Sequence, residues 1–300
     1  MLGAIIGDVV GSRYEFGGMK GKSFPMFHPM CTFTDDTVCT IAVAKTLIDN
    51  YPIDYGEEGL EKIKKDLVEN FKYFVKKNPN CGYGRNFYYW ATGHYKNGYK
   101  PYNSWGNGSG MRVSPVGWIA NSIEEVKKLS KAVSEATHNH PEGIKGAEAI
   151  AMCIYMARLG KTKEEIKEYI YDNYYPELDY LDYDELLETY EFDVSCQGSV
   201  PQAIFCFLIG ESFNDVIKTA VSIGGDSDTI ACMAGSIAEA YYKDKQDITA
   251  TIKKFNKNIE FPKEFVDITN DFLKLVKNDS YRLEYKPMAG KHAYNKCQFL

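Results

Sequence analysis

The chain has 300 residues, of which 44% are hydrophobic and 25% are charged, a composition typical of a globular protein that can bury a core without disulfide or metal cross-links. Its formal net charge of −6 and isoelectric point near 5.5 argue against a nucleic-acid-binding protein, which usually carries a basic face. The apolar N-terminus lacks a basic region and is interrupted by Asp8, so neither a signal peptide nor a membrane anchor is expected. The eight cysteines form no CxxC pair, which favours buried free thiols in a reducing compartment, so a cytoplasmic protein is expected. We also expect it to be a monomer.

The first predicted helix carries a repeated glycine. Gly3, Gly7 and Gly11 recur at every fourth residue and therefore share one helix face. Because glycine weakens a helix, a face of glycines indicates that another helix packs very close to it. The next helix is expected over 35–49, with Thr34 as its N-cap. Further helices are expected over 59–76, 85–92, 123–135, 144–159 and 163–173.

Two stretches interrupt this pattern. Residues 97–111 are rich in glycine, and residues 174–193 are acidic and rich in tyrosine, so both are interpreted as loops or surface excursions. Later helices are expected over 200–209, 213–222, 229–242 and 264–277. Alternating strand patterns are nearly absent, so the sequence predicts one compact all-α domain over 1–300, with 243–300 as its C-terminal helical extension.

Two of the predicted helices begin with a pair of carboxylates next to a threonine. The first is FTDDT at residues 33–37, and the second is GGDSDT at residues 224–229, where Gly224 and Gly225 permit a tight turn. One acidic residue stabilises the first turn of a helix by about 0.3–1 kcal/mol, but a second one adds repulsion unless a cation is bound. Thr37 is expected to be only a first-turn residue.

Such an acidic pair has two interpretations. Carboxylate and hydroxyl oxygens are the ligands that Mg²⁺ and Mn²⁺ prefer, and two helix starts that meet would match a two-metal site. Two unrelated helix caps are the alternative.

Two other motifs carry weaker signals. Gly106, Gly108 and Gly110 alternate with small polar residues, which would let backbone N–H groups approach a diphosphate, although a plain surface loop would look the same. The pair His138 and His140 could bind zinc, but no cysteine or histidine partner stands at ligand spacing, so capping or core histidines are expected instead.

Five stretches taken in order resemble the ADP-ribosylglycohydrolase family: GAIIGDVVGSRYEF, FTDDT, SWGNGSGMR, THNHP and GGDSDTIACMAGSIA. The resemblance covers residues 1 to about 242. It implies an all-α orthogonal helical bundle with a binuclear Mg²⁺ or Mn²⁺ centre. It also implies hydrolysis of the bond that joins ADP-ribose to a protein side chain or a small acceptor.

The resemblance implies roles for particular residues. Metal ligation falls on Thr34, Asp35, Asp36, Asp226, Asp228 and Thr229. Catalysis by a general acid or base falls on Glu15, Asp35 or Asp36. Substrate binding falls on Glu15, Ser104, Trp105, Gly106, Asn107, Gly108, His138 and Gly225. Arg112 could face a phosphate or form a structural ion pair.

Two other functions remain open at this point. A family member that only binds ADP-ribose, or that is a structural protein, is expected to have lost a metal-ligand residue. In this sequence all six ligand residues are present. A two-metal phosphoesterase would hold the reacting phosphate in the glycine-rich loop, and its products would differ.

Overall fold

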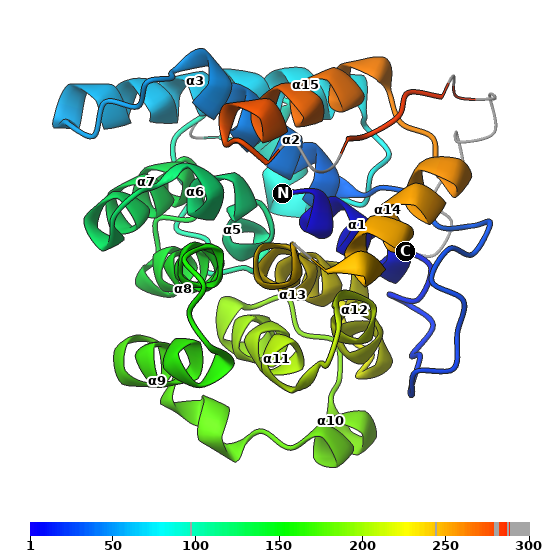
Figure 1. Ribbon diagram of the computed structural model, residues 1–300. Coiled ribbons are helices and arrows are strands. Elements are labelled where there is room, and N and C mark those ends of the chain that lie inside the picture. The colour runs from blue at the N-terminus through cyan, green and yellow to red at the C-terminus, as the bar shows by residue number, and fades with distance from the viewer. Residues whose placement is uncertain (97, 244, 279–281, 287, 289–300) are drawn as a thin grey trace.

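Helices joined by turns and loops make up the described part of the chain, residues 1–96, 98–243, 245–278, 282–286 and 288, in the computed structural model (Figure 1). Within these residues the only pairing of the sheet type is an isolated β-bridge between Gly106 and Ser195. The all-α prediction is therefore confirmed. The helices are α1 (Leu2–Gly11), α2 (Asp35–Asp49), α3 (Glu57–Lys77), α4 (Arg85–Ala91), α5 (Gly108–Met111), α6 (Ser114–Ile119), α7 (Ile123–Glu135), α8 (Pro141–Arg158), α9 (Lys163–Asn173), the 3₁₀ helix η1 (Pro176–Tyr180), α10 (Tyr183–Thr189), α11 (Cys196–Ile209), α12 (Phe213–Ser222), α13 (Ser227–Tyr242), α14 (Gln246–Asn258) and α15 (Lys263–Leu275).

Helices α1 and α13 pack closely enough that a side chain would not fit between them. A Cβ atom added to Gly3 would lie 2.2 Å from the carbonyl oxygen of Gly235, and one added to Gly7 would lie 2.0 Å from that of Ala231. At Gly11 the added atom would lie 2.4 Å from Cα of Asp228. The glycine face predicted for α1 therefore packs along α13 from Asp228 to Glu239, and this contact brings the start of α13 beside the end of α1.

Helix α2 begins where the sequence predicts. Thr34 has an extended backbone, and its side chain accepts the N–H of Asp36, as an N-cap does. Helices α3 and α15 lie along α2 at one end of the molecule, and α9 and α10 lie at the other (Figure 1). The ring of Phe33, directly before the cap, lies 5.6 Å from the ring of Phe261 and 5.4 Å from that of Phe265. The C-terminal helices thus hold the start of α2 in place.

Several elements differ from the prediction. Helix α5 replaces the end of the glycine-rich break expected over 97–111, and neither α6 nor α14 was expected. Residues 174–193 form η1 and α10 rather than a loose excursion, because Leu178 and Leu186 are buried against the core. Glycine and acidic residues lower the helix signal in these stretches, and tertiary packing overrides it.

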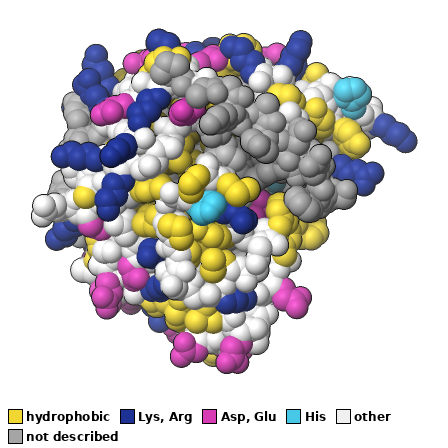
Figure 2. All heavy atoms as spheres, turned by 90° about the vertical axis from the view of Figure 1, so that its right-hand side faces the viewer, with side chains coloured by type: hydrophobic (Ala, Val, Ile, Leu, Met, Phe, Trp, Pro, Cys, Tyr) yellow, Lys and Arg dark blue, Asp and Glu magenta, His cyan; other side chains and the backbone are white. Residues whose placement is uncertain are grey.

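The surface adds two observations. On the face in Figure 2, hydrophobic side chains gather near the middle, with charged side chains around them. A hollow of about 520 Å³ lies between residues 24–27 and the helices α12 and α14, and neither Asp36 nor Asp228 lines it.

Among the described residues, no helix combines the length and the hydrophobicity needed to cross a membrane. The seven cysteines in this part of the chain are buried, and Cys297 lies outside it.

Candidate active site

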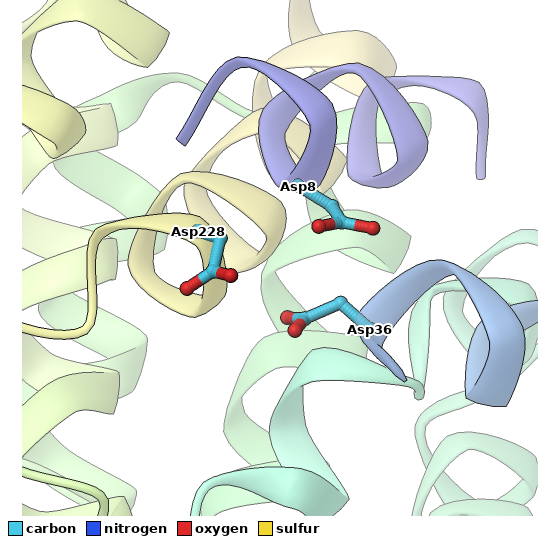
Figure 3. A group of neighbouring side chains, drawn as sticks. All are labelled: Asp8, Asp36 and Asp228. Atoms are coloured by element: carbon cyan, nitrogen blue, oxygen red, sulfur yellow. The ribbon is translucent and has the colours of Figure 1, made fainter. Parts of the chain in front are cut away.

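Three carboxylates from three different helices converge beneath the surface. Asp8 comes from α1, Asp36 from the first turn of α2 and Asp228 from the first turn of α13 (Figure 3). One oxygen of each lies within 4.8 Å of the others, and all three side chains are buried. Glu15 and Asp226 form a second such group with Asp228, which both groups share. The two acidic helix starts therefore meet, as the two-metal interpretation requires.

Asp36 lies at the centre of the first group. It is 1% exposed, and its Oδ1 is buried with no hydrogen-bond partner among the described residues. Burial, followed by the charges of Asp8 and Asp228, raises its pKa well above the usual range. A buried carboxylate oxygen without a partner destabilises the fold, so this group has the environment of a cation ligand.

The oxygens around Asp36 also have the spacing of a hard-metal site. Mg²⁺ binds oxygens at about 2.0–2.1 Å in an octahedron, so neighbouring ligand oxygens lie roughly 3 Å apart. Asp36 Oδ2 lies 3.2 Å from Thr34 Oγ1 and 3.3 Å from Thr229 Oγ1. These two spacings and the unpartnered Oδ1 fit a divalent cation.

The second group is held from the glycine-rich loop. Asp226 Oδ2 accepts a hydrogen bond from Asn107 Nδ2 at 2.7 Å. Burial and the charge of Asp228 raise the pKa of Asp226 well above its usual range. The chain reaches Asp226 through Gly224 and Gly225, whose φ angles of 77° and 66° favour glycine. Gly225 packs against the ring of Tyr190, so the segment after α10 borders the site.

Asp35 occupies a different position from its neighbour. It is half-buried and belongs to neither group of three acids found among the described residues. Its backbone N–H donates to the carbonyl of Cys81 at 2.7 Å, and its charge contributes to the raised pKa of Asp36. A role for Asp35 as ligand or catalyst therefore stays a prediction.

Asp8 was missed as a site residue. The sequence drew attention to it only as an interruption of an apolar segment, yet an aspartate in a helix that is buried throughout is itself a signal of function or pairing. The expectation for Thr37 was wrong, because its N–H and its hydroxyl both donate to Asp8. Burial and the charge of Asp228 raise the pKa of Asp8 to about 6, against the opposing effect of these hydrogen bonds.

The loop of residues 104–108 lies beside the acids. It pairs with the segment before α11, since Asn107 N–H donates to the carbonyl of Val194 at 2.8 Å. Gly106 N–H donates to Ser104 Oγ at 3.2 Å, and Trp105 is 50% exposed, so its ring has a face open to solvent. A Cβ atom on Gly108 would lie 3.1 Å from His138 Nε2, which places the histidine ring directly behind the loop.

The two histidines have separate tasks. His140 is the N-cap of α8 and accepts the N–H of Glu142, as expected of a capping histidine. His138 is buried, with Nδ1 2.7 Å from Thr137 Oγ1, and burial lowers its pKa well below the usual range. Its ring is therefore neutral near pH 7, and no histidine belongs to a potential metal group in the described ranges.

Arg112 has neither of the roles considered from the sequence. Its guanidinium is buried over the ring of Phe71 and donates to the carbonyl of Val133 and to Thr137 Oγ1. It is thus a structural residue that supports the turn before His138.

Residues 1–277 match the family model described as ADP-ribosylglycohydrolase, and the chain belongs to this family. Among curated proteins, it is 27% identical to ADP-ribosylhydrolase ARH3 of Homo sapiens, over 81% of this chain and 84% of the human protein. It is 24% identical to ADP-ribosylarginine hydrolase Tri1 of Pseudomonas putida (strain GB-1), over 81% of this chain and 69% of that one. A solved structure described as an ADP-ribosylglycohydrolase-related protein complex shares the fold, with a TM-score of 0.65 and 20% identity over 92% of this chain and 95% of that one.

Proposed function

We propose that the protein hydrolyses the N- or O-glycosidic bond between ADP-ribose and a protein side chain or small acceptor, and so releases ADP-ribose. The observation that carries this proposal is the convergence of buried carboxylates at the starts of α2 and α13, with one oxygen of Asp36 unpartnered. Membership of the ADP-ribosylglycohydrolase family supports it. The names of the relatives, an ADP-ribosylhydrolase and an ADP-ribosylarginine hydrolase, agree with this reaction.

The site is proposed to hold two divalent cations, Mg²⁺ or Mn²⁺. When bound, they would supply Lewis-acid stabilisation of ribose oxygens and of the attacking water. Asp228 belongs to both groups of acids, so it could hold a cation in either group. The ligands would be Thr34, Asp35, Asp36, Asp226, Asp228 and Thr229.

Proton transfer is assigned to Glu15 rather than to Asp36. Glu15 is half-buried and within 4.8 Å of the other acids of its group, so it borders both the acids and solvent. Asp36 is buried between two threonine hydroxyls and has no such access. In this arrangement Glu15 moves a proton at the attacking water or at the leaving atom, while the buried carboxylates stabilise the positive charge that develops on the ribose ring.

The opposite side of the site is proposed to bind the diphosphate and adenosine. Arginine has no acceptor atom, so Arg112 must be the donor in its hydrogen bond with Thr137 Oγ1. The proton of the Thr137 hydroxyl is therefore available for His138 Nδ1. His138 then carries its proton on Nε2, beside the glycine-rich loop, where it can donate to a phosphate oxygen. The half-exposed Trp105 offers a face for the adenine ring.

Product analysis tests the proposal. Purified protein is incubated with substrates that carry ADP-ribose on arginine, serine, acetyl or nucleobase groups, with Mg²⁺ and with Mn²⁺ separately. Release of free ADP-ribose from at least one linkage is expected. AMP with ribose phosphate would point to a phosphoesterase instead, and binding of ADP-ribose without turnover of any linkage would point to a non-catalytic relative.

A further inference from the structure

Asp8 is surrounded by hydrogen-bond donors from the start of α2. Its Oδ2 accepts the N–H of Thr34 at 2.9 Å, the N–H of Thr37 at 3.1 Å and the Thr37 hydroxyl. Its Oδ1 accepts the Thr34 hydroxyl at 2.6 Å. The side chain is fully buried, so these four bonds replace its hydration.

This pattern is a helix cap supplied by another helix. In an ordinary capping box, the N-cap residue and the third helical residue exchange side-chain bonds with each other's N–H groups. Here Thr34 is the N-cap and Thr37 is the third residue of α2, and Asp8 of α1 accepts both of their N–H groups. One carboxylate of α1 is therefore hydrogen-bonded to both ends of the first turn of α2.

The same carboxylate orients a candidate metal ligand. A threonine hydroxyl can bind a cation through a lone pair only if its proton points elsewhere. The Thr34 hydroxyl is within donating distance of Asp8 Oδ1, at 2.6 Å, and of Asp36 Oδ2, at 3.2 Å. Its one proton goes to the shorter contact with Asp8, which leaves a lone pair on the side of Asp36. Partners of this kind behind the ligands fix their orientation and tune metal affinity.

Asp8 itself differs from the ligands in one respect. It lies within 4.8 Å of oxygens of Asp36 and Asp228, but its Oδ2 already accepts three hydrogen bonds from α2. Asp36 Oδ1, in contrast, is buried with no hydrogen-bond partner in the described chain. This difference separates a carboxylate that organises the protein from one that can bind an ion.

We propose that Asp8 is a positioning residue, which sets the metal affinity of the site by orienting Thr34 and fixing the start of α2, without binding the cation itself. This inference rests on the two-cation site of the proposed function. An amide at position 8 would bring its own NH₂ donors toward the donors of α2, so Asp8→Asn should disturb the arrangement without adding volume.

Isothermal titration of the metal-free full chain with Mn²⁺ provides the test. We expect Asp8→Asn to weaken Mn²⁺ binding roughly 10–100-fold, the usual cost of losing an outer partner of a ligand. Thr37→Val removes one donor to Asp8 and should weaken binding by a smaller factor, and Thr37→Ser should restore it. Thr37→Val also keeps the test decisive should Asp8→Asn fail to fold.

Glu239 provides a matched control. It is also a fully buried acid in the contact between α1 and α13, where it accepts the N–H of Gly3 at 2.8 Å and pairs with the amino group of Met1. Glu239→Gln should lower the melting temperature but leave the Mn²⁺ dissociation constant within about twofold of the wild type, an expected result for a site with no shared partners.

The outcomes separate the two proposals. Unchanged Mn²⁺ affinity in folded Asp8→Asn and Thr37→Val proteins, or equal weakening in Glu239→Gln, would assign Asp8 a purely structural role and overturn this inference. Absence of Mn²⁺ binding by the wild-type chain would instead overturn the two-cation site, and the inference with it.

Discussion

The starts of α2 and α13 have similar sequences but are held in different ways. At α2, Thr34 caps the helix and Asp8 accepts hydrogen bonds from both Thr34 and Thr37. At α13, Asp226 is the N-cap, yet its side chain caps none of the described N–H groups of the helix; it is bonded to Asn107 of the glycine-rich loop. One helix start is thus organised by a neighbouring core helix, and the other depends on the glycine-rich loop.

This difference indicates a division of labour within the site. The start of α2 should be ordered without a ligand, because buried hydrogen bonds to Asp8 hold it in place. The α13 end follows two glycines with positive φ, and Asp226 is hydrogen-bonded to a loop rather than to its own helix, so ligands should contribute more to its order.

The largest loss of activity is expected when the carboxylate of Asp36 or that of Asp228 is neutralised. Asp36→Asn and Asp228→Asn should each lower the release of ADP-ribose by more than the roughly 10–100-fold that an outer partner costs. Because each change also removes repulsion among buried acids, the metal-free variants should melt at a higher temperature than the metal-free wild type. Turnover assays and thermal melts measure both effects, and a variant with full activity would contradict the assignment.

Adding a side chain to the tight contact between α1 and α13 should have the next largest effect. Gly3→Ala and Gly11→Ala each force a Cβ atom against α13, so each should lower the free energy of unfolding by about 1–3 kcal/mol or more. Only Gly11 faces Asp228, so only Gly11→Ala should also weaken Mn²⁺ binding. Urea unfolding and titration compare them, with Gly84→Ala, which has open space around it, as the neutral control.

The metal-free protein should become more stable as the pH falls from 7 to 5. Burial and mutual repulsion raise the pKa of Asp8 to about 6 and those of Asp36 and Asp226 well above the usual range. These acids make the folded chain bind more protons than the unfolded chain, whereas the lowered pKa of buried His138 has the opposite effect. Because three acids outweigh one histidine, the free energy of unfolding should rise by about 1–3 kcal/mol.

Bound Mn²⁺ should reverse that sign, because it favours the ionised carboxylates and is released as they are protonated. Thermal melts with and without the metal measure both curves. Two parallel curves would show that the acids and the cation do not interact.

The smallest effect is expected at Thr137, which contacts His138 behind the glycine-rich loop. Thr137→Val removes the hydroxyl that sets the protonated nitrogen of His138, so the dissociation constant for ADP-ribose should rise roughly 3–10-fold, the cost of about one hydrogen bond. Thr219→Val changes a similarly buried threonine of α12 and should leave that constant unchanged. Wild-type affinity in Thr137→Val would remove His138 from the proposed phosphate contacts.

Local signals in the sequence were sufficient for much of the fold. The cap at Thr34, the bounds 35–49 of α2 and the glycine face of α1 each depend on residues within one or two helical turns, and each is confirmed. Helix α14 was missed although Ile248, Ile252 and Phe255 recur at helical spacing, because polar residues dominate the segment.

The site was harder to predict in full. The two acidic helix starts could be paired from composition alone, but the part played by Asp8 depends on contacts between helices. The same holds for Thr37, whose partner lies 29 positions away in the chain. Helix α5 lies within a glycine-rich stretch, where Gly110 packs so closely that a Cβ atom on it would lie 2.9 Å from Met233 Sδ. Sequence spacing does not reveal such approaches.

The central claim is that the starts of α2 and α13 together form a two-cation centre for hydrolysis of ADP-ribosyl bonds. Stepwise return of Mn²⁺ to chelated, inactive protein, with bound metal and released ADP-ribose measured in the same samples, tests it most directly. The claim predicts two ions per chain, with activity regained as the second site fills. Full turnover after exhaustive chelation would contradict it.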